Sequence, residues 1–244
     1  MKFFETASKW QIEGNSVFHV ADRTINSSEV VQTLAPHLTD ERKARIDAVI
    51  NQRTFRVATV VEHLYDIGNI SAVMRSAESF GFLPFHIIER PGAKYKMSDR
   101  ISRGSEKWLD IHRHSSTQSC LAGLRSVGFR IYAADLQAAT VIDGVNVDAQ
   151  KIFNSPKVAV VFGNERDGIT SEAREMVDGC FKLSMHGFAQ SFNISVAAAL
   201  TFQIVYQARA RAETGCGDLS LEEKLAVRAH YYLRTLDGAE QYFR

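Results

Sequence analysis

The segment MHGFAQSFNISVAAAL (residues 185–200) decides the fold prediction, because it places a glycine and several hydrogen-bonding side chains directly before a helix of small and apolar residues. Ser191 and Asn193 stand where a helix N-cap is expected, and one capping residue is enough for that purpose. Gly187 and Gln190 then remain without a capping role. We therefore interpret the segment as a ligand-binding loop that leads into a buried helix.

The composition is that of a folded protein with one domain of ordinary size and short appendages. Of the 244 residues, 45% are hydrophobic and 10% aromatic, which is enough for a sizeable core. Cys120, Cys180 and Cys216 are far apart and form no C-x-x-C motif, so neither a disulfide framework nor a zinc motif is indicated. The chain has no apolar run of signal-peptide or membrane-spanning type. We expect a cytoplasmic protein without a membrane partner.

Predicted strands and helices alternate along the middle of the chain. The predicted strands are FRVATVVEHL (55–64), PFHIIE (84–89), FRIYAAD (129–135), KVAVVFG (157–163) and CFKLS (180–184). Helical spacing of apolar residues appears in NISAVMRSAESFGF (69–82), TQSCLAGLRSVG (117–128), TSEAREMVD (170–178) and residues 193–213. Parallel strands need crossovers long enough to hold a helix. The sequence therefore predicts an α/β fold, a mostly parallel sheet with helices on both faces.

The two ends of the chain differ from this central pattern. Residues 54–212 form the predicted α/β domain. Residues 1–53 are predicted as a helical N-terminal extension with a turn at Pro36 and a second helix that Thr39 or Asp40 caps. The segment TGCGD (214–218) interrupts the chain, and residues 213–244 are predicted as a C-terminal helical extension whose helix begins at Ser220.

Polar residues follow two of the predicted strands. GNERDG (163–168) follows one, where Gly163 permits a close backbone approach, Gly168 permits a positive φ and Glu165 lies at the tip. Ligands of open α/β sheets bind beyond the carboxyl ends of the strands, so this loop is a candidate ligand edge. A tight turn with its charges in water remains the alternative.

The first predicted strand leads into YDIGNISAVMR (65–75), which places Asn69 at a helix start and Arg75 beside the apolar stripe. Each has a simpler alternative, because Asn69 can be an N-cap and Arg75 a surface arginine. A dinucleotide-binding fold would carry G-x-G-x-x-G between the first strand and helix. Its absence counts against a nicotinamide-dependent enzyme.

The net charge of +1 indicates no polyanion partner, but two segments are basic. Residues 41–56 carry five Lys/Arg against two acids, and residues 90–114 carry seven against three. They are either solvated surfaces or a surface for nucleic-acid phosphates. The candidate RNA-binding residues are Arg42, Lys43, Arg45, Arg53, Arg100, Arg103 and Lys107.

His112 and His114 lie two residues apart, on one face of a possible strand. That spacing suits a metal ligand pair, but no carboxylate or cysteine accompanies them at ligand spacing in the sequence. We therefore expect solvated histidines and no metal site.

Three segments in this order resemble the TrmH branch of the SPOUT superfamily, RNA ribose 2′-O-methyltransferases that use S-adenosyl-L-methionine. They are NISAVMRSAESFG, VAVVFGNERDGIT and KLSMHGFAQSFNISVAAAL, and SRGSEKWLDIHRH between them is similar to the tRNA-modifying members. The resemblance extends from about Glu41 to Leu236. It implies the SPOUT fold, with a C-terminal deep trefoil knot that forms the cofactor pocket, and a homodimer.

The resemblance also implies roles for individual residues. The catalytic set is Asn69, Arg75, Glu165, Ser191 and Asn193, and the cofactor-binding set is Phe162, Gly163, Asn164, Leu183, Met185, Gly187, Ser191, Phe192 and Asn193. Because arginine is always protonated, Arg75 is expected to clamp a phosphate and stabilise the developing alkoxide. Many relatives have proline where this chain has Ser184. Proline would rigidify the loop, so we expect the serine to loosen cofactor binding.

The activity that the resemblance implies is methylation of the ribose 2′-hydroxyl of the D-loop guanosine at position 18 of tRNA. Ribosomal RNA is an alternative substrate, although relatives that act there often carry a large N-terminal RNA-binding domain, for which residues 1–40 are too few. A third alternative is a non-catalytic RNA-binding protein of the same fold.

Overall fold

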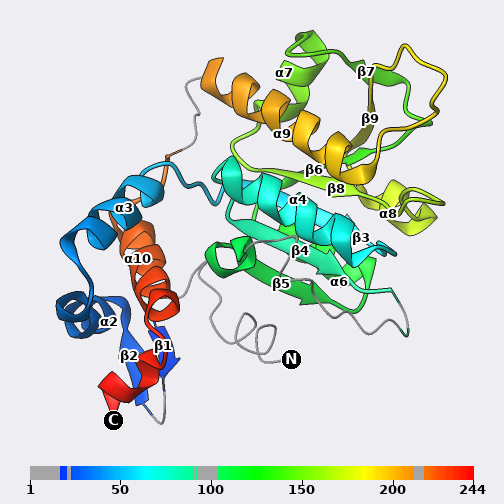
Figure 1. Cartoon of the computed structure of the whole chain (residues 1–244). Helices are drawn as coiled ribbons and strands as arrows, with labels where there is room; N and C mark the ends of the chain where they lie inside the picture. The colour runs from blue at the N-terminus through cyan, green and yellow to red at the C-terminus, as the bar shows by residue number, and fades with distance from the viewer. Residues whose placement is uncertain (1–16, 21–22, 91, 93–103, 212–216) are drawn as a thin grey trace. The chain divides into compact units, whose positions relative to one another are not determined.

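The computed structural model describes residues 17–20, 23–90, 92, 104–211 and 217–244. The chain forms two compact units, one of Phe55–Cys216 and one that joins Met1–Thr54 with Gly217–Arg244. Figure 1 shows the helices of the first and last segments packed together. The two terminal segments, expected as separate extensions, thus belong to a single unit.

The larger unit contains a seven-stranded sheet in the order β5-β4-β3-β8-β6-β9-β7, and every neighbouring pair is parallel. The strands are β3 (Val57–Glu62), β4 (Pro84–Ile88), β5 (Asp110–His114), β6 (Arg130–Ala134), β7 (Thr140–Ile142), β8 (Val158–Phe162) and β9 (Gly179–Leu183). All residues of β3, β4 and β8 are buried, as expected for inner strands covered on both faces. The predicted α/β class is confirmed.

Helices cover both faces of this sheet. On one face lie α4 (Ile67–Ser79), α7 (Val147–Phe153) and α9 (Ile194–Arg211), with α9 packed against the other two (Figure 1). Phe202 of α9 makes edge-on contacts with Phe82 and with Phe162 at the end of β8. The other face carries α6 (Thr117–Ser126) and α8 (Ser171–Met176), whose Leu121 and Ala173 join a core with residues of the inner strands. The short helix η2 (Ser105–Trp108) precedes β5.

The last strand of the sheet is inserted between two earlier ones. β9 pairs with β6 on one side and β7 on the other, although both precede it in the chain. After β9 the backbone N–H of Ser184 donates to the carbonyl of Ile142, at the end of β7. The loop 184–193 then leads into α9, which packs back over α4.

The start of α4 differs from the expectation. Asp66, and not Asn69, is the N-cap, and its carboxylate accepts from the N–H of Gly68 at 2.7 Å. Asn69 lies in the first turn, so its side chain is available for other contacts. Gly128 follows α6 with a φ of +91°, which agrees with the predicted stop.

The sequence predicts that the N-terminal part of the smaller unit is helical. The structure differs, because this part also contains two strands. A hairpin of β1 (Val17–Val20) and β2 (Arg23–Asn26) precedes α2 (Ser27–Leu34), η1 (Ala35–His37) and α3 (Asp40–Ile50). Thr39 caps α3 as expected. In the C-terminal segment, Ser220 and Glu223 form a capping box at α10 (Leu221–Thr235), which packs on α2 and α3 and is followed by η3 (Ala239–Phe243).

Across the described residues, every helix is too short or too polar to cross a membrane.

Candidate active site

A cavity of about 400 Å³ opens at the carboxyl ends of β6, β8 and β9. This is the edge at which open parallel sheets bind ligands. Its lining includes Phe162, Gly163, Asn164, Glu165, Leu183, Met185, Ser191, Phe192 and Asn193, which all belong to the residue sets expected from the sequence. The volume lies in the range of sites for small organic ligands.

A chain of hydrogen bonds joins the three sequence segments at this cavity. The amide of Asn69 donates to Glu165 Oε1 at 2.8 Å, and the amide of Asn193 donates to Asn69 Oδ1 at 3.2 Å. Asn193 Oδ1 in turn accepts from the backbone N–H of Ser195 at 2.8 Å and from its hydroxyl at 2.6 Å. Residues 124 positions apart therefore form one polar network, with Asn69 buried at its centre.

Glu165 is held in its ionised form by this network. Burial raises the pKa of Glu165, but the hydrogen bond from Asn69 and bonds from backbone N–H groups, including that of Tyr65 at 3.2 Å, outweigh it. The net effect is a pKa below the ordinary value of 4.5. Glu165 is therefore an anion at neutral pH and accepts hydrogen bonds at the cavity.

The loop that carries Glu165 depends on its glycines, as the sequence indicates. A Cβ on Gly163 would lie 2.0 Å from the carbonyl carbon of Gly168, so only glycine fits there. Gly168 has a φ of +71° and exchanges two backbone hydrogen bonds with Asn164. The side chain of Asn164 accepts from the N–H groups of Arg166 and Asp167 and closes the turn.

Gly187 is the exception among the expected cofactor-binding residues. It is exposed and does not line the cavity, and a Cβ built on it meets nothing within 4 Å. The neighbouring loop residue Phe188 is fully exposed. Ser184 is held by its backbone N–H, which donates to Ile142, a bond that a proline at this position could not make.

Arg75 does not line the cavity, whereas Glu165, Ser191 and Asn193 do, and Asn69 is hydrogen-bonded to Glu165 and Asn193. Six residues of helix separate Arg75 from Asn69, so the two side chains point about 120° apart around α4. Arg75 is exposed, and its guanidinium forms no hydrogen bond or ion pair with any residue that the structure describes. The role of Arg75 as the phosphate clamp therefore stays a prediction.

Some residues that line the cavity are not predicted from the sequence. Asp135, Gln137 and Arg174 line the cavity, where Arg174 forms an ion pair with Asp135 at 2.5 Å and donates to Gln137. Asp135 directly follows β6, so the rule that ligands bind at the carboxyl ends of strands could have identified it. Arg174 lies on α8, and no pattern in the sequence points to it.

An aromatic and cationic cluster lies beside the polar network. Tyr65 is 42% exposed, and the guanidinium carbons of Arg90 and Arg166 lie 4.3 and 5.7 Å from the centroid of its ring. His63, two residues before Tyr65, has a φ of +54°, the one positive value at a non-glycine position in the described chain. Strained backbone of this kind is concentrated at functional sites.

The expected RNA-binding residues have different surroundings. Arg42 and Arg45 are exposed, Lys43 pairs with Asp40 at 2.7 Å, and Lys107 is half-buried on η2. Arg53 is only 2% exposed and its guanidinium lies over the ring of Tyr231 at 6.0 Å, so the prediction that it contacts RNA is wrong. The predictions for Arg100 and Arg103 lie outside the described residues.

His112 and His114 are not the solvated pair that the sequence suggests. His112 Nε2 lies 3.0 Å from Asp110 Oδ2, and His114 Nε2 lies 3.0 Å from Nδ1 of His86. Cys120 lies close to His86 and His114. The carboxylate of Asp110 and the thiol of Cys120 therefore do lie beside these histidines. Cys120 is brought there by the folding of the chain.

The cavity has the surroundings that a polar organic ligand with an aromatic part requires. Phe162, Leu183 and Phe192 supply apolar surface, and Gly163 lines the cavity without a side chain. The ionised Glu165 and the two asparagines supply fixed hydrogen-bonding groups at the side of the cavity. Such a site can bind a cofactor and position a second reactant.

Comparison with known proteins identifies the family of this chain. Residues 56–203 match the SpoU rRNA Methylase family. A tRNA (guanosine(18)-2'-O)-methyltransferase of Borreliella burgdorferi is 32% identical over 204 residues, which are 83% of this chain and 89% of the relative. The crystal structure of the A. aeolicus TrmH/SpoU tRNA modifying enzyme matches with a TM-score of 0.71 and 24% identity over 81% of this chain and 98% of that one. An AdoMet-bound rRNA methyltransferase from Sinorhizobium meliloti has a TM-score of 0.51 and 20% identity over 66% of this chain and 60% of that one. The chain belongs to the SpoU methylase family.

Proposed function

We propose that this chain transfers a methyl group from S-adenosyl-L-methionine to the ribose 2′-hydroxyl of the guanosine at position 18 of tRNA. The observation that carries the proposal is the hydrogen-bonded chain from Glu165 through Asn69 to Asn193 beside the cavity. The printed activity of the Borreliella burgdorferi relative supports the substrate. Since tRNA is its substrate, we place the enzyme in the cytoplasm.

The cavity residues fit the cofactor. Apolar side chains such as Phe162 and Leu183 offer a surface for the adenine ring, and Ser191 and the backbone at Gly163 offer hydrogen-bonding groups. When bound, the cofactor supplies an electrophilic methyl group on a sulfonium centre. The AdoMet-bound Sinorhizobium meliloti enzyme shares the fold of this chain.

The residues of the chain then hold the reacting hydroxyl in position. Correct alignment of two reactants is worth several orders of magnitude in rate. Asn69 and Asn193 are fixed by their mutual hydrogen bond and by Glu165, so they form a rigid surface for the ribose. Arg75 is the group for the adjacent phosphate, because a guanidinium binds phosphate oxygens in a bidentate manner.

Arg75 meets this requirement if the active site contains two subunits. Val196 and Leu200 are exposed apolar side chains four residues apart on α9, and the exposed Phe192 lies in the loop just before this helix. We assign these three side chains to the surface that contacts a second copy. We therefore propose a homodimer in which Arg75 of one copy acts at the cavity of the other. In such a dimer, Arg75 of one subunit would lie opposite Glu165 of the other subunit, and the fold of each chain would not change.

We also propose that the chain is knotted where it forms this cavity. The insertion of β9 between β6 and β7 and the return of α9 over α4 support a threaded path. Such a path confines the loop 184–193 and the cavity residues that it carries.

RNA contacts are proposed for both units. Arg42, Lys43 and Arg45 on α3 and Lys107 on η2 offer charge for phosphates, together with Arg100 and Arg103. Tyr65 offers a face on which a nucleobase can stack, with the guanidinium groups of Arg90 and Arg166 beside it.

Ribosomal RNA is the second candidate substrate, because the family description and the Sinorhizobium meliloti enzyme both name it. Incubation of the purified chain with labelled S-adenosyl-L-methionine and separate tRNA and rRNA pools distinguishes the two. We expect label in tRNA alone. Calorimetric titration with the cofactor separates an enzyme from a non-catalytic RNA-binding protein, for which we would see no binding.

A further inference from the structure

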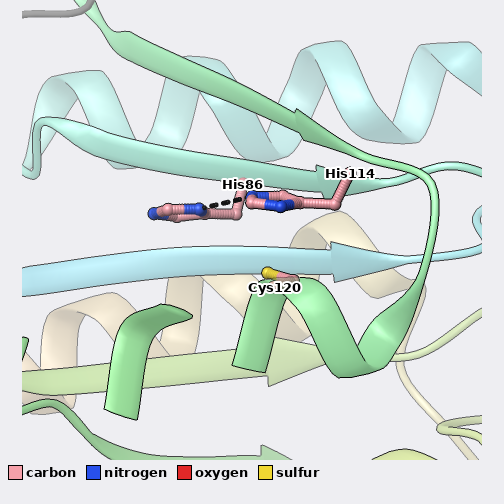
Figure 2. Close-up of side chains that lie close together, drawn as sticks. All are labelled: His86, His114 and Cys120. Atoms are coloured by element: carbon pink, nitrogen blue, oxygen red, sulfur yellow. Dashed lines mark hydrogen bonds between the residues drawn. The ribbon is translucent and has the colours of Figure 1, made fainter. Parts of the chain in front are cut away.

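Two histidines and a cysteine from three elements meet beneath α6. His86 on β4, His114 on β5 and Cys120 on α6 each offer a ligand atom, and these atoms all lie within 4.8 Å of one another (Figure 2). His86 Nδ1 and His114 Nε2 are 3.0 Å apart. None of the three residues lines the proposed active site.

The surroundings of this cluster keep the imidazoles neutral and oriented. Burial, followed by the charges of His112 and His114, lowers the pKa of His86 well below its usual range. Burial and His112 also lower the pKa of His114. His112, held by Asp110, stacks on His86 with 4.6 Å between ring centroids. Neutral imidazoles in a fixed orientation are the form of histidine that binds metal ions.

We propose that His86, His114 and Cys120 bind one zinc-type metal ion. Two imidazole nitrogens and one thiolate are a donor set that zinc accepts in tetrahedral geometry, whereas magnesium and calcium require oxygen ligands. A bound ion would lie about 2.1 Å from each nitrogen and about 2.3 Å from the sulfur. A water molecule completes the coordination.

Metal binding at this place would join an edge strand to two neighbouring elements. Among the described strands, β5 lies at one edge of the sheet and pairs with β4. One ion would connect β4, β5 and the helix that follows β5. Burial and the nearby Glu62 raise the pKa of Cys120 to about 12, so the ion must displace the thiol proton, and affinity should increase with pH.

The test is a titration of the full chain, cleared of metal with a chelator, with cobalt(II) as a spectroscopic substitute for zinc. We expect one equivalent of cobalt to produce a thiolate-to-cobalt absorption band in the near ultraviolet, which zinc then removes. The Cys120→Ser variant should lose this band. Cys180 lies outside the cluster, so the matched control Cys180→Ser should keep it.

Two further measurements test the same metal site, namely the cobalt affinity of a histidine variant and the effect of zinc on the Tm. His114→Gln should weaken cobalt binding by at least about tenfold. Zinc should raise the Tm of the wild type by a few degrees and leave that of Cys120→Ser unchanged. Circular dichroism and methyl transfer to RNA check that the variants are folded. A wild type without the band, or a band that persists in Cys120→Ser, would overturn the proposal.

Discussion

At the scale of single residues, Glu165 organises the site by accepting hydrogen bonds and not by donating a proton. Its lowered pKa means that it remains charged throughout the neutral range. Because its two oxygens accept from the Asn69 amide and the Tyr65 backbone, it fixes the start of α4 against the loop after β8. A lowered pKa makes Glu165 a weaker proton acceptor, so we assign the proton of the ribose hydroxyl to another acceptor, such as the phosphate or water.

Substitution of Tyr65 is expected to weaken the binding of RNA without changing the affinity for the cofactor. We predict that Tyr65→Ala raises the KM for tRNA by about tenfold, because stacking on an aromatic ring stabilises a bound base. Tyr65→Phe keeps the ring and should behave like the wild type. Steady-state kinetics with tRNA, together with calorimetry of cofactor binding, checks this. If Tyr65→Ala lowers cofactor affinity and leaves the KM for tRNA unchanged, the assignment of Tyr65 to RNA is wrong.

At the scale of elements, the loop 163–168 tolerates no side chain at its first position. Gly163→Ala would place a methyl group 2.0 Å from the backbone of Gly168. We predict a loss of about 1–3 kcal/mol in stability and a clear loss of cofactor affinity. The control is Gly123→Ala in α6, where an added Cβ meets nothing within 4 Å. Thermal unfolding and calorimetry measure both effects, and equal behaviour of the two variants would contradict this account of the loop.

The buried histidine of β4 makes stability dependent on pH. The pKa of His86 in the folded chain lies below the ordinary value of 6.5, so below that pH the unfolded chain binds a proton that the folded chain does not. The folded state therefore loses stability as the pH falls from 6.5 towards the folded pKa. We predict a lower Tm at pH 5.5 than at pH 7.5, and a smaller difference in His86→Gln. An identical pH dependence in wild type and variant would contradict the assignment.

The sequence identifies elements whose signal is local and misses those that depend on distant contacts. The β-branched runs identify β3 and β8 because strands buried on both faces are continuously apolar. The strands β1, β2 and β7 are too short for any periodicity to show. The network at Glu165 could be predicted only through the family resemblance, since its members lie up to 124 residues apart. The position of Cys120 beside His86 depends on how α6 packs, which no spacing reveals.

At the scale of the whole molecule, the proposed homodimer predicts that two subunits share each active site, because Arg75 does not line the cavity of its own chain. A mixture of the inactive variants Arg75→Ala and Glu165→Gln tests this. In a mixed dimer, one site combines the intact Glu165 of one subunit with the intact Arg75 of the other. After exchange of subunits we predict about a quarter of wild-type activity, because half of the dimers are mixed and each has one intact site.

The separate variants are the controls for this mixture, and each should be inactive alone. If each chain builds its site from its own Arg75, the mixture stays as inactive as its components. That result would contradict the shared site and require Arg75 to reach the cavity of its own chain.

We expect the cavity beside Glu165, Asn69 and Asn193 to be the place where the ribose of one guanosine in tRNA is methylated. The most direct measurement is mass spectrometry of nuclease fragments from unmodified tRNA that has been incubated with the purified chain and S-adenosyl-L-methionine. We predict one 2′-O-methylguanosine, in the D-loop fragment at position 18, and none with Asn193→Ala. A methyl group on a base, methylation of ribosomal RNA instead of tRNA, or full activity of Asn193→Ala would contradict it.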